Sequence, residues 1–495
     1  MKYLATIEIK SLTPSAIGGY NPNTHDEIFR ITSLRGLVAW WLRAIVSGVA
    51  YDKGDINHDK KAIEAQKRIF GSTNRSSRLI IKTKPKNTNE IKNIDTKNIK
   101  TLKQLIKHIR LKLLLMGKRE SVNEKNSKYE KKKNDIIISK LSDMLRNLDV
   151  TICVYSSAKE PNLEEVLGLH AVILSLLLGG LGKGSRRAMG AVKISSVKLS
   201  RRVMELLEKE GCKGLLQISQ KADENTLKMI IDDARKNMLK MIIGDARKIA
   251  EKMLKEGVLG DIQTGELPPF PKIPSLSEKA AEIYVKKLEK LGNISCEDRL
   301  STLNSEVLEK LFLRDARDLG RLPNRLQKTK LTEKKVKQKI VVVSEATALG
   351  SYILGLPRGA KKPPKDHRCR VVFNTNNFNT NNTNTTIFNT TIRSKKKASI
   401  VKEVPQKRDE QYSGFVKFND ESEEYEHYRR PSPVIVSLLD EQTVVITFLK
   451  SSDWPKELQW FTTREKEVET LSINDAYEQV SKYLSNNYQK VWPES

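Results

Sequence analysis

The fold is decided by residues 163–199, which read LEEVLGLHAVILSLLLGGLGKGSRRAMGAVKISSVKL. The apolar first part predicts a buried helix over residues 163–178, and residues 190–199 alternate as a strand does. Between them, four of the six residues from Gly179 to Gly184 are glycines, and the loop carries Lys183, Arg186 and Arg187. A turn that ends a helix commonly needs one glycine. A helix-ending turn therefore does not by itself explain four glycines together with three cations.

The strands and the helix predicted before this stretch, taken together with it, give an order of elements that is known from other domains. Strands are predicted at residues 3–9, 78–84 and 149–155, and a second amphipathic helix starts at Thr32 or Ser33. The order is β-α-β-β-α-β, which is typical of ferredoxin-like or RRM-like domains. Such a domain has one antiparallel sheet with two helices on one face and is often used to hold RNA.

We expect an α+β chain with two ferredoxin-like (RRM-like) domains, a helical middle region and a basic insertion. The predicted parts are a first domain over 1–200 with a Lys-rich insertion at 85–148, a helical region over 201–335 with a Pro-rich linker at 267–274, and a second domain over 336–495. The helical region contains a duplication, in which residues 227–236 recur at 239–248. The second domain contains an Asn/Thr-rich loop at 373–392, which we expect to be disordered.

The charge of the chain indicates a polyanionic partner. Its 495 residues include 89 Lys and Arg against 60 Asp and Glu, a net charge of +29. Nucleic acid is the commonest partner of so basic a protein, and an acidic membrane surface is the alternative. The sequence has no apolar run of membrane-spanning length and no secretory signal, so a cytoplasmic location is expected. The four cysteines are scattered, and His367 with Cys369 is too few ligands for zinc, so no metal or cofactor is expected.

The positive charge is concentrated in particular segments. Residues 82–133 hold 17 Lys and Arg against five Asp and Glu. Such a stretch is either a solvated surface or a basic arm over an RNA backbone, and the sequence leaves both open.

The glycine loop, residues 179–190, lacks the Walker spacing and runs from a helix into a strand, which argues against a nucleotide-binding loop. We expect a flexible backbone with free N–H groups, suited to an approaching phosphodiester chain. On the first helix, Trp41 lies in the apolar stripe and is expected in the core, whereas Trp40 either stacks on a base or packs under the basic insertion. Arg35 opposes the dipole of its own helix, which a phosphate opposite it would explain.

One catalytic possibility lies in the loop between the first strand and the first helix. His25 and Asp26 could act as an acid–base pair that activates a ribose 2′-hydroxyl for strand cleavage. Adjacent polar residues in a loop usually have no such role, so an endoribonuclease is the alternative to a binding protein.

Six motifs together resemble the RAMP superfamily of CRISPR effector proteins. They are TPSAIGGYN at 13–21, ITSLRGLVAWWLRA at 31–44, IFGST at 69–73, GGLGKGSRRAMGAV at 179–192, LGLPRG at 354–359 and YRRPSPV at 428–434. The combination is most similar to the subunit-one family of the type III-B Cmr complex, whose members have two ferredoxin-like domains. The basic insertion, the duplication and the Asn-rich tract depart from that family.

The resemblance implies a non-catalytic RNA-binding subunit of an antiviral CRISPR ribonucleoprotein. Its implied partners are the CRISPR guide RNA near its 3′ end, the target RNA and other Cmr subunits. RNA contact is implied for Arg35, Arg43, Lys183, Ser185, Arg186, Arg187, Arg429 and Arg430. The family's backbone subunits cleave target RNA with an Asp in the equivalent of the 15–30 loop, so Asp26 keeps the enzyme alternative open.

Overall fold

The structure is a computed structural model of the chain. It describes residues 1–16, 31–85, 147–182, 184–220, 232–313, 369–373, 415–418, 425–427, 432–453, 457–460, 469–471 and 473–493. These residues divide into two compact units. Unit 1 comprises Met1–Leu308, Pro433–Ser452 and Leu484–Ser495, and unit 2 comprises Glu309–Ser432 and Asp453–Tyr483.

The first sheet of unit 1 has the predicted element order. Its strands are β1 (Lys2–Ser11), β2 (Leu79–Pro85), β3 (Asp149–Ser156) and β4 (Val192–Leu199). They pair antiparallel in the order β2-β3-β1-β4. The predicted helices are α1 (Ile31–Asp52) and α6 (Leu163–Leu178), with an additional helix α2 (His58–Phe70) after α1. The β-α-β-β-α-β order is therefore confirmed, and the fold is α+β.

Capping and side-chain pairing fix α6 at the place that the sequence indicates. Asn162 and Glu165 form a reciprocal capping box at its first turn. Glu164 and Glu165 are buried, and they pair with Arg68 of α2 and with Arg78 just before β2. These ion pairs tie the start of α6 to α2 and to the first sheet.

In the part of the middle region that the structure describes, the helices are α7 (Arg201–Lys209), α8 (Gly214–Gln220) and α10 (Asp232–Lys255). The second copy of the duplication, residues 239–248, lies inside α10, whereas the first half of the first copy, residues 227–231, lies outside the described residues. The segment after α10 is hydrogen-bonded to α1: the Tyr51 hydroxyl donates to Pro268 O at 2.5 Å, and Leu276 N donates to Ala44 O at 2.8 Å. A Cβ on Gly48 would lie 2.3 Å from Leu276 C, so this close approach requires glycine.

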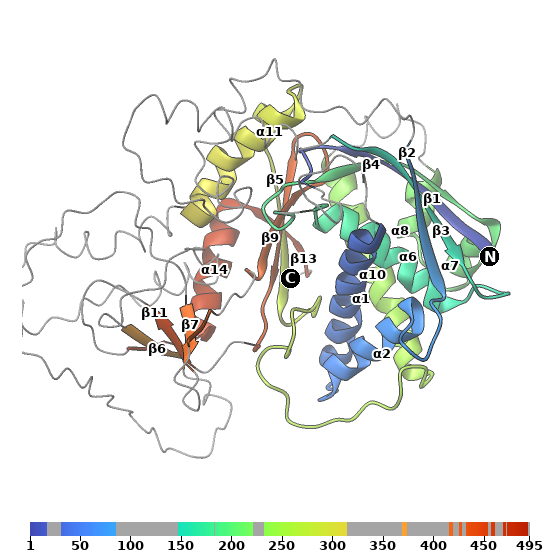
Figure 1. The fold of residues 1–495 in the computed structure, drawn as a ribbon, viewed down its shortest axis with the longest axis horizontal. Coiled ribbons are helices and arrows are strands. Elements are labelled where there is room, and N and C mark those ends of the chain that lie inside the picture. The colour runs from blue at the N-terminus through green and yellow to red at the C-terminus, as the bar shows by residue number, and fades with distance from the viewer. Residues whose placement is uncertain are drawn as a thin grey trace, which may run out of the picture. The chain divides into compact units, whose positions relative to one another are not determined.

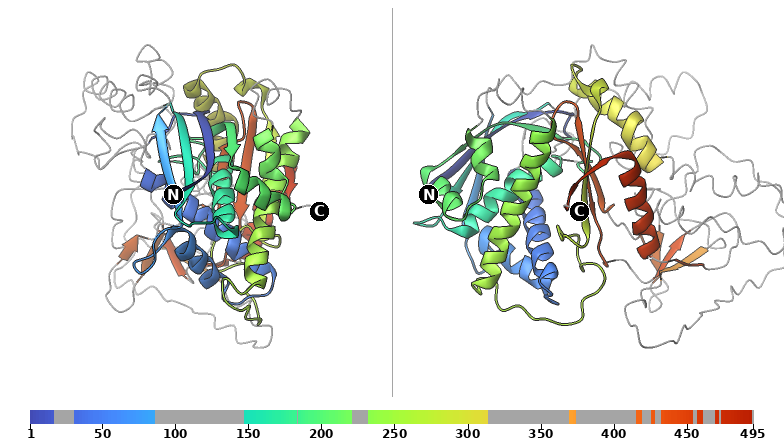
Figure 2. Two further views of the ribbon diagram at one scale, coloured as in Figure 1. Left: turned by 90° about the vertical axis from the view of Figure 1, so that its right-hand side faces the viewer. Right: turned by 180° about the vertical axis from the view of Figure 1, so that it is seen from behind.

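A second antiparallel sheet of unit 1 has the order β13-β5-β10-β9. It consists of β5 (Ala281–Lys287), β9 (Val434–Leu438), β10 (Thr443–Leu449) and β13 (Gln489–Trp492). Helices α1, α6 and α10 lie between the two sheets (Figures 1 and 2). Apolar side chains of both sheets and of these helices share one core, in which Trp41 is fully buried as predicted.

Within the region over 201–335 that we expected to be helical, residues 281–287 instead form the strand β5. The sequence AEIYVKK buries Ile283 and Val285, and the strand lies between β10 and β13. Both edges of β5 are therefore hydrogen-bonded, which outweighs a helical preference. Beyond β5 follow η2 (Glu289–Leu291), α11 (Cys296–Leu303) and the π-helix η3 (Asn304–Leu313).

Unit 2 contains a five-stranded sheet with the order β12-β6-β11-β7-β8. Its strands are β6 (Cys369–Phe373), β7 (Phe415–Phe418), β8 (Tyr425–His427), β11 (Glu457–Trp460) and β12 (Glu469–Leu471). The helix α14 (Ile473–Asn487) runs from unit 2 into the last segment of unit 1. The tract at 374–392 and residues 86–146 lie outside the described residues, so their predictions stay predictions.

Candidate nucleic-acid interface

The glycine loop lies between the segment that follows β1 and the strand β9 of the second sheet. On one side, Gly190 N donates to Pro14 O at 2.9 Å, and Ala191 N donates to Thr13 Oγ1 at 3.0 Å. On the other side, Ala188 N donates to Val436 O at 2.8 Å, and Val436 N donates to Arg186 O at 3.2 Å. Residue 187 thereby forms a parallel bridge with residue 436. The loop is thus held between the segment that follows β1 and the second sheet of unit 1.

The glycines of the loop are required by its close packing. Gly190 has a φ of 66°, and a Cβ there would lie 2.0 Å from Leu181 O. A Cβ on Gly180 would lie 2.4 Å from Met189 O. The prediction of a flexible loop with free N–H groups is therefore wrong for this part of the loop. The N–H groups of Leu181, Arg187, Ala188 and Gly190 all donate to backbone carbonyls.

Trp40 and Arg186 join the glycine loop to α1. The Cζ atom of Arg186 lies 5.0 Å from the centroid of the Trp40 ring, which is a cation–π distance. The edge of Trp40 meets the buried Trp41 at a centroid distance of 5.1 Å and an interplanar angle of 87°. The observed contacts of Trp40 are with Trp41 and Arg186, so stacking on a base and packing under the basic insertion both stay predictions. Trp40 supports an arginine on the loop surface.

Arg35 caps the helix α2. Its Nη2 donates to the carbonyl oxygen of Phe70, the last residue of α2, and its Cζ lies 5.9 Å from the Phe70 ring centroid. A cation at a helix C-terminus is favourable. This contact explains why Arg35 is tolerated in the first turn of its own helix. Arg43 lies one turn beyond Trp40 on α1 and is half-buried.

The described site residues fall into two groups. Ser185, Arg186 and Arg187 share the glycine loop, and all three are half-buried. Arg35 and Arg43 lie on α1. The remaining predicted site residues, Lys183, Arg429, Arg430, His25 and Asp26, lie outside the described residues. RNA contact by any of them stays a prediction.

Two residues of β9 were not expected at the site. Val436 provides the backbone bridge to the loop, and the Ser437 hydroxyl donates to Gly179 O. The motif that ends at Val434 could have indicated this strand, because β9 starts there. No sequence pattern pairs it with a loop about 250 residues earlier.

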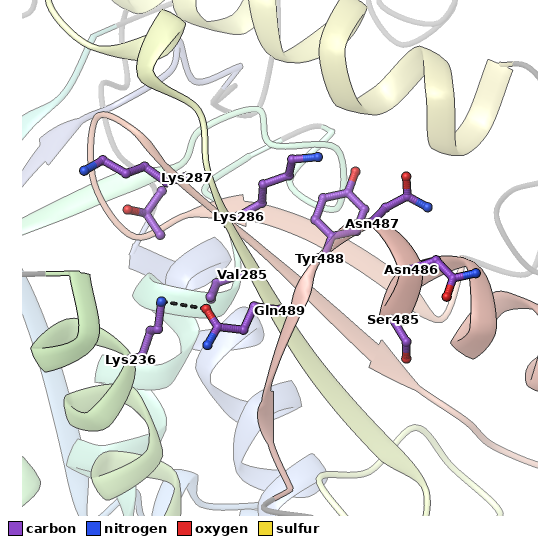
Figure 3. A pocket seen from close by; sticks show the side chains of 10 residues that line it. Lys236, Val285, Lys286, Lys287, Ser485, Asn486, Asn487, Tyr488 and Gln489 are labelled. Carbon is purple, nitrogen blue, oxygen red and sulfur yellow. Dashed lines mark hydrogen bonds between the residues drawn. The ribbon is translucent and has the colours of Figure 1, made fainter.

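A second site with several lysines is a pocket of about 390 Å³ at the edge of the second sheet (Figure 3). Its walls come from the start of α10, from β5, from β10 and from the turn between α14 and β13. Lys236 donates to Gln489 Oε1 at 2.6 Å, and Lys286 Nζ lies 5.3 Å from the Tyr488 ring centroid. The residues that line it are Lys236, Val285, Lys286, Lys287, Thr443, Ser485, Asn486, Asn487, Tyr488 and Gln489. They include no carboxylate, so the pocket suits an anionic group.

The buried histidines of unit 1 are structural. His58 Nε2 accepts from Lys272 N at 3.3 Å, and its Nδ1 lies 2.9 Å from Ser47 Oγ. Burial lowers the pKa of His58 to about 4 and that of His170 to about 4. The Ser47–His58 pair resembles a nucleophile and its base, but both side chains are fully buried, so no substrate reaches them. Across the described residues, no three His, Cys, Asp or Glu side chains gather where they could hold a metal ion.

Part of the sequence is similar to a known family. A family model of the RAMP superfamily matches residues 8–193, so this part of the chain is similar to RAMP-superfamily proteins. The match contains α1 and the whole glycine loop. No curated protein sequence matches the chain. None of the helices in the described ranges is long and apolar enough to cross a membrane.

Two solved structures align with the chain over nearly its whole length. A chain of the type III-B Cmr-beta complex bound to cognate target RNA, solved by electron cryomicroscopy, matches with a TM-score of 0.52 and 16% identity. The match covers 98% of this chain and 99% of that one. The crystal structure of apo Cmr1 from Pyrococcus furiosus matches with a TM-score of 0.45 and 16% identity, covering 99% of each chain. The first of these establishes the similarity of fold.

Proposed function

We propose that this chain is a non-catalytic RNA-binding subunit of a type III-B CRISPR ribonucleoprotein. In this proposal it holds the 3′ end region of the CRISPR RNA, helps to capture target RNA in antiviral defence, and contacts other Cmr subunits. Its place of action is the cytoplasm. The observation that carries the proposal is the glycine loop, which is hydrogen-bonded to the segment after β1 and to β9 and carries Arg186 and Arg187.

The geometry of the loop favours recognition of phosphate by side chains. Four of its N–H groups are used inside the protein, so an RNA backbone that approaches the loop would meet its side chains rather than these N–H groups. Arginine is suited to this role because its planar fork can donate two parallel hydrogen bonds to one phosphate. A rigid support also lowers the entropy lost when the arginine binds.

The similar fold of a Cmr-beta chain and the RAMP match support the assignment to this kind of complex. We infer that the first sheet, with its order β2-β3-β1-β4, and the sheet formed by β13, β5, β10 and β9 are the centres of two ferredoxin-like domains. The net charge of +29 supports a polyanionic partner.

The first experiment measures RNA affinity as a function of salt. Purified chain is titrated against labelled single-stranded RNA, and the Arg186→Ala and Arg187→Ala variants are compared with it. For each phosphate that a variant no longer neutralises, the slope of log K against log salt is expected to flatten by about 0.7. The matched control is Arg201→Ala on α7, because Arg201 is an exposed arginine that pairs with Glu205 at 3.0 Å. Unchanged slopes in both loop variants would contradict the proposal.

The second experiment tests the absence of catalysis. The assembled complex is expected to cleave target RNA with the same pattern when this subunit carries Asp26→Ala. Abolished cleavage in that variant, with the complex still assembled, would favour the endoribonuclease alternative. Sequencing the 3′ ends of RNA that co-purifies with the complex tests where the guide is held.

A further inference from the structure

The outer face of the first sheet is a surface that the glycine loop does not explain. Helices cover one face of this sheet, and the other face is turned away from them (Figure 2). The alternation of burial separates the two faces. On β3, Ile152 and Val154 are buried toward the helices, whereas Thr151 and Tyr155 are half-exposed on the outer face.

A β-bulge places a second tyrosine on the outer face. On β1, strict alternation would group Tyr3 with Ala5, Ile7 and Ile9, all of which are buried. However, the pairing of β1 with β3 shifts between Tyr3 and Ala5, so Leu4 is an extra residue. Such an insertion reverses the side of the residues before it. Tyr3 therefore lies on the outer face, with 40% of its surface exposed.

The two tyrosines form a fixed pair. Tyr3 lies directly opposite Tyr155 in the register, and their ring centroids are 6.1 Å apart at an angle of 70°. The Tyr3 hydroxyl lies 3.0 Å from Lys198 O and can donate to it, which holds its ring across the neighbouring strand β4. Because both rings have settled positions before any ligand arrives, a ligand that stacks on them loses little entropy.

On the same outer face, a lysine flanks the tyrosine pair on each of the two outer strands, β2 and β4. In the next row of the register, Lys82 of β2 and Lys198 of β4 lie at the two ends, with Cys153 and Thr6 between them. Both lysines are exposed, and Lys82 Nζ lies 5.6 Å from the Tyr155 ring centroid. One more row along, Lys84 lies across from Glu8.

We propose that this face binds single-stranded RNA, with a base stacked on the Tyr3–Tyr155 pair and phosphates near Lys82 and Lys198. The inference rests on the proposed function and adds a surface that contacts bases. Aromatic rings beside cations are the combination that holds single strands without reading their sequence, because every base has a flat face. A four-stranded sheet with aromatic side chains on its two central strands is one arrangement that presents them. Here the central strands are β3 and β1.

The experiment compares labelled oligouridine with an abasic oligomer of equal length, which keeps the phosphates but has no bases. Wild-type chain is expected to bind oligouridine more tightly by roughly 5- to 150-fold for each stacked base. The Tyr3→Ala/Tyr155→Ala variant is expected to lose this preference and to bind both oligomers alike. The matched control is Tyr3→Phe/Tyr155→Phe, which keeps both rings and is expected to keep the preference. Circular dichroism confirms that each variant is folded.

If the double alanine variant does not fold, cross-linking of wild-type chain, analysed by mass spectrometry, replaces the binding comparison. Photo-cross-linking of 5-iodouridine RNA to wild-type chain is expected to attach at Tyr3 or Tyr155. A preference for oligouridine that survives in the folded alanine variant, or cross-links confined to other segments, would overturn the inference.

The inference and the proposed function fail differently. If wild-type chain binds RNA through Arg186 and Arg187 but the tyrosine variants bind as wild type does, only the sheet-face inference is refuted. If wild-type chain and its complex bind no RNA, the proposed function is refuted with it. Loss of other subunits from the complex, with RNA preference intact in the alanine variant, would identify the face as a protein interface and overturn the inference.

Discussion

Replacing Gly190 by alanine tests whether the glycine loop is as rigid as its contacts indicate. Gly190 has a φ of 66°, donates to Pro14 O at 2.9 Å and accepts from Leu181 N at 2.8 Å. A Cβ at this position would lie 2.0 Å from the carbonyl oxygen of Leu181, which belongs to the backbone and cannot rotate aside. The loop must therefore shift to accept alanine.

The expected loss of stability is the sum of two effects. The left-handed conformation costs a residue with a Cβ about 1 to 2 kcal/mol. Displacement of the loop breaks both hydrogen bonds of Gly190, each of which contributes about 1 kcal/mol. We expect the free energy of unfolding to fall by about 3 to 4 kcal/mol. Urea denaturation measures the change in the transition that includes unit 1, and hydrogen exchange at Leu181 and Ala188 reports the loop itself.

The control is Gly36→Ala on the exposed face of α1. A Cβ on Gly36 would have no atom within 4 Å, and alanine in a helix is preferred to glycine by about 0.5 to 1 kcal/mol. Both substitutions add one methyl group to a glycine, yet Gly190→Ala is expected to lower the free energy of unfolding and Gly36→Ala to raise it. If Gly190→Ala changes stability by less than about 0.5 kcal/mol and leaves exchange at Ala188 unaltered, the loop is not held as described.

Three further predictions concern unit 1. His58 and His170 have pKa values lowered to about 4 by burial, so the chain is expected to lose about 2 kcal/mol for each between pH 6.5 and about pH 5, measured by denaturation at several pH values. Arg247→Ala breaks a largely buried ion pair with Asp52 at 2.9 Å and is expected to cost about 3 kcal/mol in unfolding free energy. Ser437→Ala removes the donor to Gly179 O and is expected to cost about 1 kcal/mol and to speed hydrogen exchange in the loop.

The sign of the pH effect follows from which state binds the proton. Well above pH 6.5 both histidines are neutral in the folded and the unfolded chain, so their contribution to stability is fully present. As the pH falls toward 4, the unfolded chain is protonated first and stability is lost. His170 Nδ1 is 2.9 Å from Val166 O, so it donates there, and Nε2 is buried without a partner. Constant stability over this range would contradict the burial of both rings.

The control for Arg247→Ala is Arg201→Ala, which breaks the exposed ion pair of Arg201 with Glu205. This control is expected to change the free energy of unfolding by less than about 1 kcal/mol.

The elements of the first sheet were predictable because local patterns determine them. Residues 3–9 alternate, and α6 starts at an asparagine with a glutamate three residues on and ends at a glycine. The strand β5 was not predictable, because AEIYVKK followed by LEKL also fits an amphipathic helix. Its strand form depends on β10 and β13, which are encoded far away in the sequence.

The candidate site was predictable in part. The cations of the glycine loop and the burial of Trp41 could be inferred from the sequence. The rigidity of the loop could not, because Pro14 and Val436 provide its partners across about 170 and 250 residues. Likewise, the capping of α2 by Arg35 depends on the turn between two helices. The sequence indicates which side chains are available, and the long-range pairings decide their partners.

Because the glycine loop is hydrogen-bonded to β9, it cannot reach its final structure until β9 has been synthesised. The loop is complete at residue 190, but its partner β9 starts at Val434, and β13 completes the second sheet at Trp492. At a translation rate of about 5 to 20 residues per second, the loop waits roughly 12 to 50 seconds for β9. During that interval Arg186 and Arg187 are synthesised but not yet positioned. A nascent chain therefore cannot present the finished loop until nearly all of it has left the ribosome.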